Sequence, residues 1–198
     1  MFNFTYNVFC MGRMLKDKAI GSLSDYYNGE YSNVERMEPS NSGILINFNK
    51  LNTDPTHIID NIYLGNAYNA SNYSLMEERN IGLVVNITTE IPNYFPDNLE
   101  YYNIHIRDLN GKRIGEFFDD YLAKIDEYKN SNDNKSIFIH CFMGSSRSAT
   151  LACLYLIKYH NMTVEESIKF CKDKRSLINI NLTFIEDLKT WYKNNIIG

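Results

Sequence analysis

A cysteine and an arginine six residues apart form the part of the sequence best suited to chemistry. Cys141 and Arg147 lie in residues 136–150, which read SIFIHCFMGSSRSAT. A cysteine thiolate is a strong nucleophile, and an arginine guanidinium holds two oxygens of a phosphate at once. This pair therefore predicts attack on the phosphorus of a phosphate ester, with Cys141 as the nucleophile and Arg147 as the ligand of the phosphate oxygens.

The residues around this pair predict a loop between a buried strand and a helix. Residues 137–139 are apolar and partly β-branched, as in a buried strand, and the apolar stretch 149–159 is long enough for a central helix. The backbone N–H groups of the loop and of the first helical turn would then converge on an anion. The expected phosphate-binding residues are Phe142, Met143, Gly144, Ser145, Ser146 and Arg147.

The loop also predicts how the nucleophile is supported. The positive end of the helix and Arg147 should favour the thiolate form of Cys141. We expect Ser148 to hydrogen-bond the sulfur when it becomes the leaving group, and His140 to orient the loop rather than to exchange protons. A buried cysteine is usually only a small apolar side chain, but the combined motif favours the catalytic interpretation.

The motif HCxxGxxRS at residues 140–148 resembles the phosphate loop of the cysteine-dependent protein tyrosine phosphatases. Its tail, GSSRSAT, is most similar to the dual-specificity, MAP-kinase-phosphatase-like branch, and the resemblance covers about residues 54–195. It implies a phosphoprotein phosphatase that hydrolyses phosphotyrosine, and also phosphoserine or phosphothreonine, through a phosphocysteine intermediate. It implies no cofactor and no metal, because Arg147 and the helix end supply the electrostatic stabilisation.

Strands that alternate with helices predict an α/β fold with a mostly parallel central sheet of about four to five strands and helices on both faces. We expect residues 54–198 to form this protein tyrosine phosphatase-like catalytic domain and residues 1–53 to form a partly flexible N-terminal extension. The expected strands lie at 58–65 (a pair), 83–87, 101–106 and 137–139, and the expected helices at 75–79, 114–130, 149–159, 163–174 and 182–193.

The leaving oxygen needs a proton, so a general acid must come from outside the loop. Asp108 follows the strand expected at 101–106, at the carboxyl edge where sites in parallel sheets gather. The resemblance supports this choice, because the family's acid stands about thirty residues before the cysteine and about ten before an aromatic residue, here Phe118. Residues 109–112 are expected to form a flexible loop that moves over the pocket. Asp97, Asp119 and Asp120 are weaker candidates.

The segment RSLININLTFIEDL, which ends at Leu188, resembles the closing segment of the same family. Asn181, Phe184 and Leu188 match that segment, and we interpret them as structural. Ser176 and Ile180 replace two customary prolines, which should loosen the turn.

Composition limits the expected partners and compartment. The net charge of −4 gives no basic surface for nucleic acid, and no apolar run is long enough to cross a membrane. Phosphorylated proteins are the expected partners, and the chain is expected to be a monomer or a weak homodimer formed through the N-terminal extension. Unpaired cysteine spacing and the lack of a signal peptide favour the cytoplasm, with the nucleus or a virion as alternatives. The cysteines are Cys10, Cys141, Cys153 and Cys171.

Three other activities remain open. A phosphoinositide or RNA 5′-phosphatase uses the same loop, but usually with basic residues, whereas Phe142, Met143, Ser145 and Ser146 are uncharged. A phosphoprotein-binding module with little turnover would normally lack the nucleophile. A rhodanese-like sulfur carrier would not need Asp108.

Overall fold

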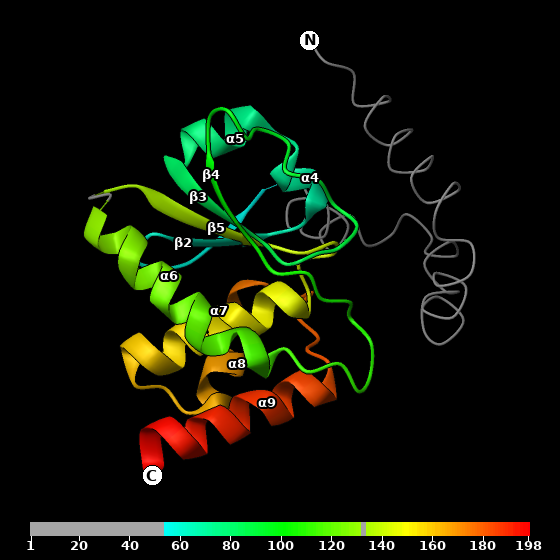
Figure 1. Cartoon of the computed structure of the whole chain (residues 1–198), viewed down its shortest axis with the longest axis vertical. Coiled ribbons are helices and arrows are strands. Elements are labelled where there is room, and N and C mark those ends of the chain that lie inside the picture. The colour runs from blue at the N-terminus through cyan, green and yellow to red at the C-terminus, as the bar shows by residue number, and fades with distance from the viewer. Residues whose placement is uncertain (1–53, 132–133) are drawn as a thin grey trace, which may run out of the picture. The chain divides into compact units, whose positions relative to one another are not determined.

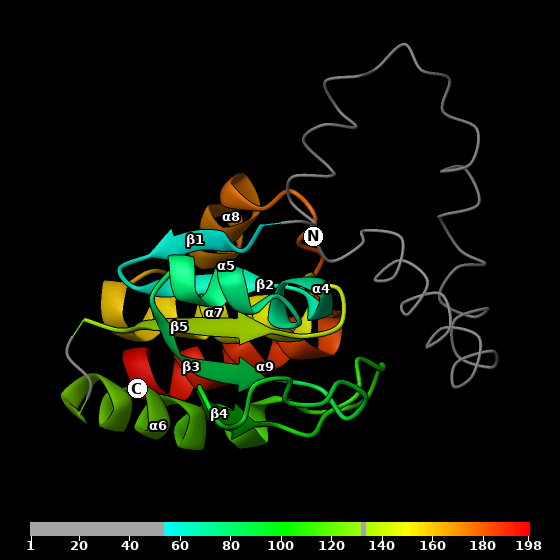
Figure 2. The ribbon, with the colours of Figure 1, turned by 90° about the horizontal axis from the view of Figure 1, so that it is seen from above.

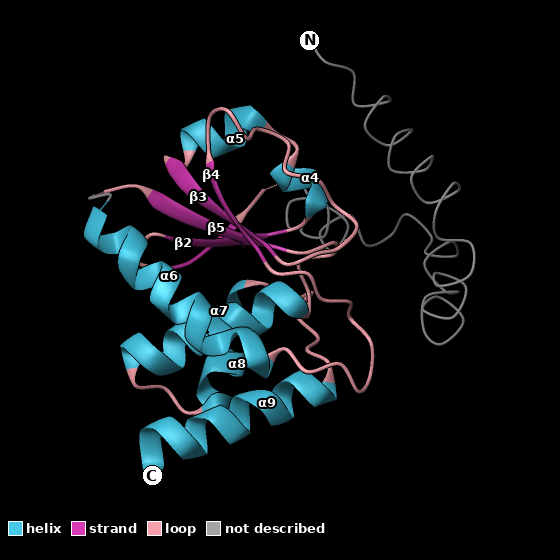
Figure 3. Ribbon diagram, viewed as in Figure 1, coloured by secondary structure: helices cyan, strands magenta, loops and turns pink. Residues whose placement is uncertain are grey.

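A five-stranded sheet with helices on both faces organises the chain in a computed structural model, which describes residues 54–131 and 134–198 (Figure 1 and Figure 3). This arrangement confirms the predicted α/β fold. The N-terminal extension, residues 1–53, lies outside the described residues. No helix of the described part is both long and apolar enough to cross a membrane.

The strand order places β5 in the middle of the sheet, as Figure 2 shows. The order is β1-β2-β5-β3-β4, in which β1 and β2 form an antiparallel hairpin and the other neighbours are parallel. The central position puts the carboxyl end of β5 at the middle of one sheet edge. The strands are β1 Thr56–Ile59, β2 Ile62–Gly65, β3 Ile81–Asn86, β4 Glu100–Asn103 and β5 Ser136–His140.

The edge strand β4 is shorter than the strand predicted over 101–106. Asn103 is opposite Asn86, the last residue of β3, so the ladder has no further partner strand. Ile104 donates one more backbone hydrogen bond to the carbonyl of Asn86 (2.9 Å), and the chain then leaves the sheet. Asp108 therefore lies in a loop after β4 and not at the end of a strand.

The helices form two layers of unequal size (Figure 1 and Figure 2). The short helices α4 and α5 cover one face of the sheet, and α6 to α9 lie on the other face. A single helical turn, η3, precedes α6, and η4 follows α9. The bounds are α4 Ala67–Ala70, α5 Tyr73–Glu78, η3 Gly115–Phe117, α6 Phe118–Ser131, α7 Arg147–His160, α8 Val164–Lys174, α9 Leu182–Tyr192 and η4 Lys193–Ile197.

Alternation along the buried strands gives each helical layer its own core. Phe138 and Val84 belong to the small core that includes Met76 of α5. Ile137 and Ile139, the neighbours of Phe138 in β5, belong to the large core. Helix α7 crosses that large core and is buried from its first residue through Ile157, as its nearly uniform apolar sequence predicts.

The helix expected at 163–174 begins as the sequence predicts. The Thr163 side chain accepts a hydrogen bond from the backbone N of Glu166 (3.2 Å), and the Glu166 carboxylate accepts one from the backbone N of Thr163 (2.8 Å). This capping box fixes the start of α8. The chain then continues from Arg175, the C-cap residue of α8, through a loop to α9.

Candidate active site

Cys141 is the first residue after the central strand β5, and its side chain is buried. Its Sγ lies 3.2 Å from the Ser148 hydroxyl oxygen and accepts a hydrogen bond from the backbone N of Gly144 at 3.3 Å. Hydrogen bonds of this kind stabilise negative charge on the sulfur. Ser148 thus lies where its hydroxyl can hydrogen-bond the sulfur.

Gly144 is required at the tightest point of the loop. Its φ is +69°, and a Cβ atom there would lie 2.5 Å from the carbonyl oxygen of Gly65. Any other residue would combine backbone strain with a steric clash. The motif in the sequence contains a glycine at this position, and the close approach of the loop backbone to Gly65 at the end of β2 explains why.

The carbonyl groups of the loop point away from its interior. Those of Phe142, Gly144 and Ser145 each accept a hydrogen bond from a group outside the loop. Because the C=O and N–H bonds of a trans peptide point in opposite directions within the peptide plane, the N–H groups that follow these carbonyls face the interior. The loop can therefore surround an anion with backbone donors. The outside donors are Ala67 N (3.1 Å), Arg175 Nε (2.9 Å) and Asn179 N (3.1 Å).

Arg147 opens helix α7, and its guanidinium is held on two sides. Nη1 donates to the carbonyl of Ile106 (3.1 Å), and Nη2 donates to the Glu90 carboxylate (2.8 Å). Nε has no hydrogen-bond partner among the described residues and lies 4.0 Å from Oδ2 of Asp108. The Nε–H group of this fixed guanidinium is thus available to bind a ligand.

Glu90 is a residue that the sequence analysis did not identify. It follows β3 at the same carboxyl edge of the sheet as Cys141. Burial raises the pKa of Glu90, but the hydrogen bond and charge of Arg147 outweigh burial and lower it below its ordinary value. Burial likewise lowers the pKa of Arg147, but the negative charges of Cys141 and Glu90 outweigh burial and raise that pKa above its ordinary value. The rule that sites gather at carboxyl strand ends would have pointed to Glu90.

Asp108 lies beside the phosphate loop, although the strand before it ends early. Its Oδ1 accepts a hydrogen bond from the Ser146 hydroxyl (3.1 Å) and one from Nδ2 of Asn181 (3.4 Å). The Asp108 side chain is 20% exposed, so protons can reach it. The weaker candidate Asp119 is engaged elsewhere, because it accepts a hydrogen bond from the indole of Trp191 (2.9 Å).

Asn181 does more than the structural role that its sequence match indicated. It caps α9 by accepting a hydrogen bond from the backbone N of Thr183 (2.9 Å), and its own backbone N donates to the Ser146 hydroxyl (3.1 Å). Its amide group also contacts Asp108. Phe184 and Leu188, the other two matches, are fully buried and pack in the large core.

His140 is held neutral beneath the loop. Burial lowers its pKa to about 4. The imidazole stacks on Phe138, with ring centroids 5.5 Å apart, and its Nδ1 lies 3.4 Å from the carbonyl oxygen of Cys141. These contacts suit a residue that orients the loop.

Arg175 is a second buried guanidinium next to the loop, and the sequence analysis did not assign it a role. Its Nε donates to the carbonyl of Gly144, and its Nη1 donates to the Thr56 hydroxyl (3.2 Å). Burial lowers the pKa of Arg175 to about 10, although the nearby Cys141 acts to raise it. The guanidinium therefore stays charged at neutral pH. Arg175 therefore ties the loop to β1 and adds positive charge near the sulfur.

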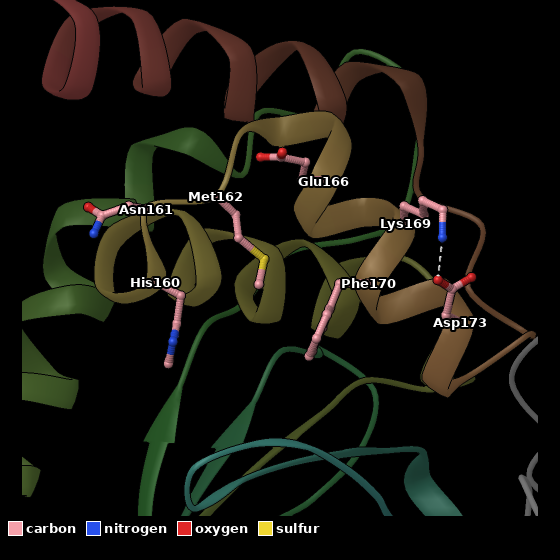
Figure 4. Close-up of a pocket in the computed structure, with 7 residues that line it drawn as sticks. All are labelled: His160, Asn161, Met162, Glu166, Lys169, Phe170 and Asp173. Atoms are coloured by element: carbon pink, nitrogen blue, oxygen red, sulfur yellow. Dashed lines mark hydrogen bonds and ion pairs between the residues drawn. The ribbon is translucent and has the colours of Figure 1, made fainter.

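A separate hollow of about 450 Å³ lies between the end of α7 and α8, as Figure 4 shows. None of the residues around Cys141, Arg147 and Asp108 lines it, and the Lys169 and Asp173 side chains pair at its rim (2.5 Å). The hollow is therefore not part of the candidate active site. Its lining residues are His160, Asn161, Met162, Glu166, Lys169, Phe170 and Asp173.

Comparison with known proteins places this arrangement among phosphatases. The family model described as "Dual specificity phosphatase, catalytic domain" matches residues 62–194. Dual specificity protein phosphatase 1-A of Xenopus laevis is 33% identical over 134 residues, which are 68% of this chain and 36% of that protein. Protein phosphatase Slingshot of Drosophila melanogaster is 31% identical over 137 residues, which are 69% of this chain and 13% of that protein. The chain thus spans about a third or less of the length of these relatives.

Solved structures share the fold. The human tyrosine phosphatase-like serine/threonine/tyrosine-interacting protein aligns with a TM-score of 0.68 and 20% identity, over 74% of this chain and 99% of that chain. A mouse putative dual specificity phosphatase complexed with zinc tungstate aligns with a TM-score of 0.67 and 20% identity, over 73% of this chain and 92% of that chain. At these identities, the likeness supports the fold alone.

Proposed function

The chain belongs to the dual-specificity phosphatase family, and we propose that it is a phosphoprotein phosphatase that hydrolyses phosphotyrosine and also phosphoserine or phosphothreonine. The observation that carries the proposal is the meeting of three groups at one sheet edge. The Cys141 sulfur lies in a loop of inward-facing amides, Arg147 keeps an N–H edge for a ligand, and Asp108 lies beside that edge. In this proposal, residues 54–198 form the catalytic domain and residues 1–53 form an extension to it.

In the first step, the Cys141 thiolate attacks phosphorus, and the bond between phosphorus and the ester oxygen breaks. Asp108 donates its proton to that oxygen, which leaves as the hydroxyl of the substrate side chain. Arg147 and the loop amides hold the other phosphate oxygens while their negative charge is redistributed. The product of this step is a phosphocysteine.

The second step releases phosphate. The Asp108 carboxylate takes a proton from a water molecule, whose oxygen attacks phosphorus. The bond between phosphorus and sulfur breaks, and Ser148 hydrogen-bonds the sulfur as negative charge returns to it. Inorganic phosphate leaves and the thiolate is regenerated. No metal takes part in this scheme, because Arg147 and the start of α7 supply the positive charge.

Phosphorylated proteins are the proposed partners, and the cytoplasm is the proposed compartment. The side chains of Phe142, Met143, Ser145 and Ser146 bring no charge to the loop, which favours a phosphoprotein over a multiply charged phosphoinositide or RNA end. Ser145 and Ser146 also direct their hydroxyl groups away from the interior, to Leu177 and Asp108.

The proposal is tested by comparing turnover of four classes of substrate by the purified full-length chain. The substrates are phosphotyrosine and phosphothreonine peptides, a phosphoinositide, an RNA 5′-triphosphate and thiosulfate. We expect the highest kcat/KM on the phosphopeptides. The Cys141→Ser variant should bind a phosphotyrosine peptide without hydrolysing it, because the hydroxyl keeps the loop's shape but lacks the thiolate.

Other outcomes would redirect the assignment. Faster hydrolysis of the phosphoinositide or of the RNA end would transfer the activity to that substrate class. Sulfur transfer from thiosulfate would indicate a sulfur carrier. Peptide binding without turnover by the unaltered protein would indicate a phosphoprotein-binding module. Substrate capture from cell extract with Cys141→Ser then identifies the natural substrate.

A further inference from the structure

The start of helix α9 contacts the loop between β4 and η3 at Asp108 and again at Gly111. Nδ2 of Asn181, the N-cap residue of α9, donates to Oδ1 of Asp108 (3.4 Å). In the first turn of α9, the Thr183 hydroxyl accepts a hydrogen bond from the backbone N of Gly111 (3.2 Å). The N-terminal end of α9 thus holds both the carboxylate and the backbone of the loop.

One turn further along the helix, the buried Asp187 holds the other end of the same loop. Its Oδ2 accepts hydrogen bonds from the backbone N of Ile114 (2.8 Å) and of Gly115 (3.0 Å). Its Oδ1 pairs with the guanidinium of Arg113 (2.6 Å). With 3% of its side chain exposed, Asp187 is satisfied almost entirely by this loop.

We propose that Asn181, Thr183 and Asp187 are positioning residues. They hold the acid loop, residues 104–114 with Asp108, against the phosphate loop before substrate binds. The general acid then works without a separate loop-closing step, in contrast to the mobile cover that the sequence predicted for residues 109–112. This inference rests on the proposed function, in which Asp108 is the general acid.

Asn181 is the centre of this arrangement because each of its polar groups has a different partner. The amide Nδ2 donates to Asp108, Oδ1 accepts from Thr183, and the backbone N donates to the Ser146 hydroxyl. Ser146 in turn donates to the same Oδ1 of Asp108. The phosphate loop, the acid loop and α9 therefore meet at one carboxylate oxygen.

This meeting point also selects which oxygen of Asp108 carries the proton. Both hydrogen bonds end at Oδ1, whereas Oδ2 lies on the side of Arg147, 4.0 Å from its Nε. A ligand on Arg147 would thus approach Oδ2. Loss of the two donors would let the carboxyl group rotate, and small errors in position reduce proton transfer strongly.

The positioning role can be separated from helix capping by substitution. Asn181→Ser keeps an oxygen that caps α9 but removes the amide donor to Asp108, since serine is also a good N-cap residue. Asn181→Ala removes both. Thr183→Val removes the acceptor for Gly111 at nearly constant volume. Asn195→Ala and Thr190→Val are matched controls, because among the described residues these side chains bond to carbonyls of their own helical turns alone.

The experiment measures kcat/KM of each full-length variant on a phosphotyrosine peptide and on dinitrophenyl phosphate, whose leaving group needs no proton. For Asn181→Ser we expect a loss of about ten- to a hundredfold on the peptide, with a loss of about threefold or less on the activated ester. Thr183→Val should show the same selectivity with a smaller loss. The two controls should match the unaltered protein on both substrates.

A double variant provides the deciding measurement. In an Asp108→Asn background, Asn181→Ser should cause no further loss on the peptide, because the group that it positions is absent. An additional loss there, or an equal loss on both esters for Asn181→Ser alone, would overturn the positioning role. A uniform loss for Asp108→Asn alone would instead overturn the proposed function, so the two failures are distinguishable.

Discussion

Nη2 of Arg147 lies 2.8 Å from Oε1 of Glu90, so the guanidinium proposed to hold phosphate has a resident carboxylate partner at the rim of the site. The Arg147 side chain is 6% exposed, whereas that of Glu90 is 40% exposed. A buried cation needs such a partner when no ligand is bound. Glu90 and the carbonyl of Ile106 together fix the plane of the guanidinium. Its Nε–H group stays available to a ligand.

Replacing Glu90 should therefore weaken phosphate binding through Arg147. For Glu90→Gln we expect kcat/KM on a phosphotyrosine peptide to fall about tenfold, because the guanidinium loses its fixed orientation. Inhibition by inorganic phosphate should weaken in parallel. Glu78→Gln is the matched control, since Glu78 pairs with Arg79 on the surface. Equal kinetics for the two variants would show that Glu90 has no part in the site.

His140 should make the fold sensitive to mild acid. Its pKa is about 4 in the folded protein because of burial, against an ordinary value of 6.5, so between these values the unfolded chain binds a proton that the folded chain does not. Stability should then fall as pH drops from 6.5 toward 4, by about 2 kcal/mol between pH 7 and pH 5. Urea unfolding at both pH values measures this change.

The comparison that isolates His140 uses two variants. His140→Gln should lose about 2 kcal/mol less than the unaltered protein on going from pH 7 to pH 5, because no buried imidazole resists protonation. His57→Gln should keep the full acid sensitivity, since His57 lies at the surface. Identical pH dependence in all three proteins would contradict the prediction.

Gly111 and Gly144, the two glycines with positive φ among the described residues, should respond differently to alanine. Gly144→Ala adds a clash with the Gly65 carbonyl to the strain of φ +69°, whereas Gly111, with φ +80°, has nothing within 4 Å of an added Cβ. We expect both variants to lose stability through backbone strain, by about 1–3 kcal/mol, with the larger loss for Gly144→Ala. Only Gly144→Ala should also lose about a hundredfold in turnover of an activated aryl phosphate, because the loop itself is distorted. Equal effects on turnover would be the contrary result.

The sequence predicted the parts of the site that local pattern determines. The HCxxGxxRS motif, a short apolar strand before it and a long apolar helix after it were enough to place Cys141, Gly144 and Arg147 in one loop. The spacing that the resemblance implies selected Asp108, whose carboxylate lies beside the phosphate loop, and its role as the general acid stays a prediction. Each of these inferences depends on neighbours in the chain or on the order of elements, which the sequence displays directly.

The supporting residues could not be predicted in the same way. Glu90 and Arg175 reach the phosphate loop across 57 and 31 positions of the sequence. Glu90 stands in no local motif, and Arg175 opens the segment RSLININLTFIEDL, in which the resemblance gave it no role. The early end of β4 depends on where its partner β3 ends, which only the ladder register shows. Asn181 was interpreted as a structural residue, and it does cap α9, but its amide contact with Asp108 joins segments 73 positions apart.

The small size of the proposed catalytic domain predicts a broad substrate range. The family match spans residues 62–194, and we expect so short a domain to lack the additional loops that would deepen a pocket. A shallow pocket should admit phosphothreonine as well as phosphotyrosine. Kinetics on a peptide phosphorylated at both residues of a Thr-x-Tyr sequence measure this directly, with release from each position followed separately. Strict preference for phosphotyrosine would count against a shallow pocket.

Oxidation should inactivate the enzyme reversibly at Cys141 without forming an internal disulfide. Peroxide converts a thiolate to a sulfenic acid, which a second thiol or a backbone nitrogen can trap with loss of water. Cys153 and Cys171 are both fully buried, and burial together with the neighbouring Cys171 raises the pKa of Cys153 well above its ordinary value. Neither is therefore a reactive partner for Cys141. Cys10 lies outside the described residues.

The expected products are a mixed disulfide of Cys141 with glutathione, when glutathione is present, and otherwise a sulfenamide with the backbone nitrogen of Phe142. Both release one water from the sulfenic acid, and a thiol reductant should restore activity from either. Mass spectrometry of peptides after limited peroxide treatment distinguishes them, and a Cys153→Ala variant should inactivate and recover at the same rates. A crosslinked peptide that joins Cys141 to Cys171 or to Cys10 would show that the trapping group is a cysteine of this chain. A crosslink to Cys10 would also give the N-terminal extension a regulatory role at the active site.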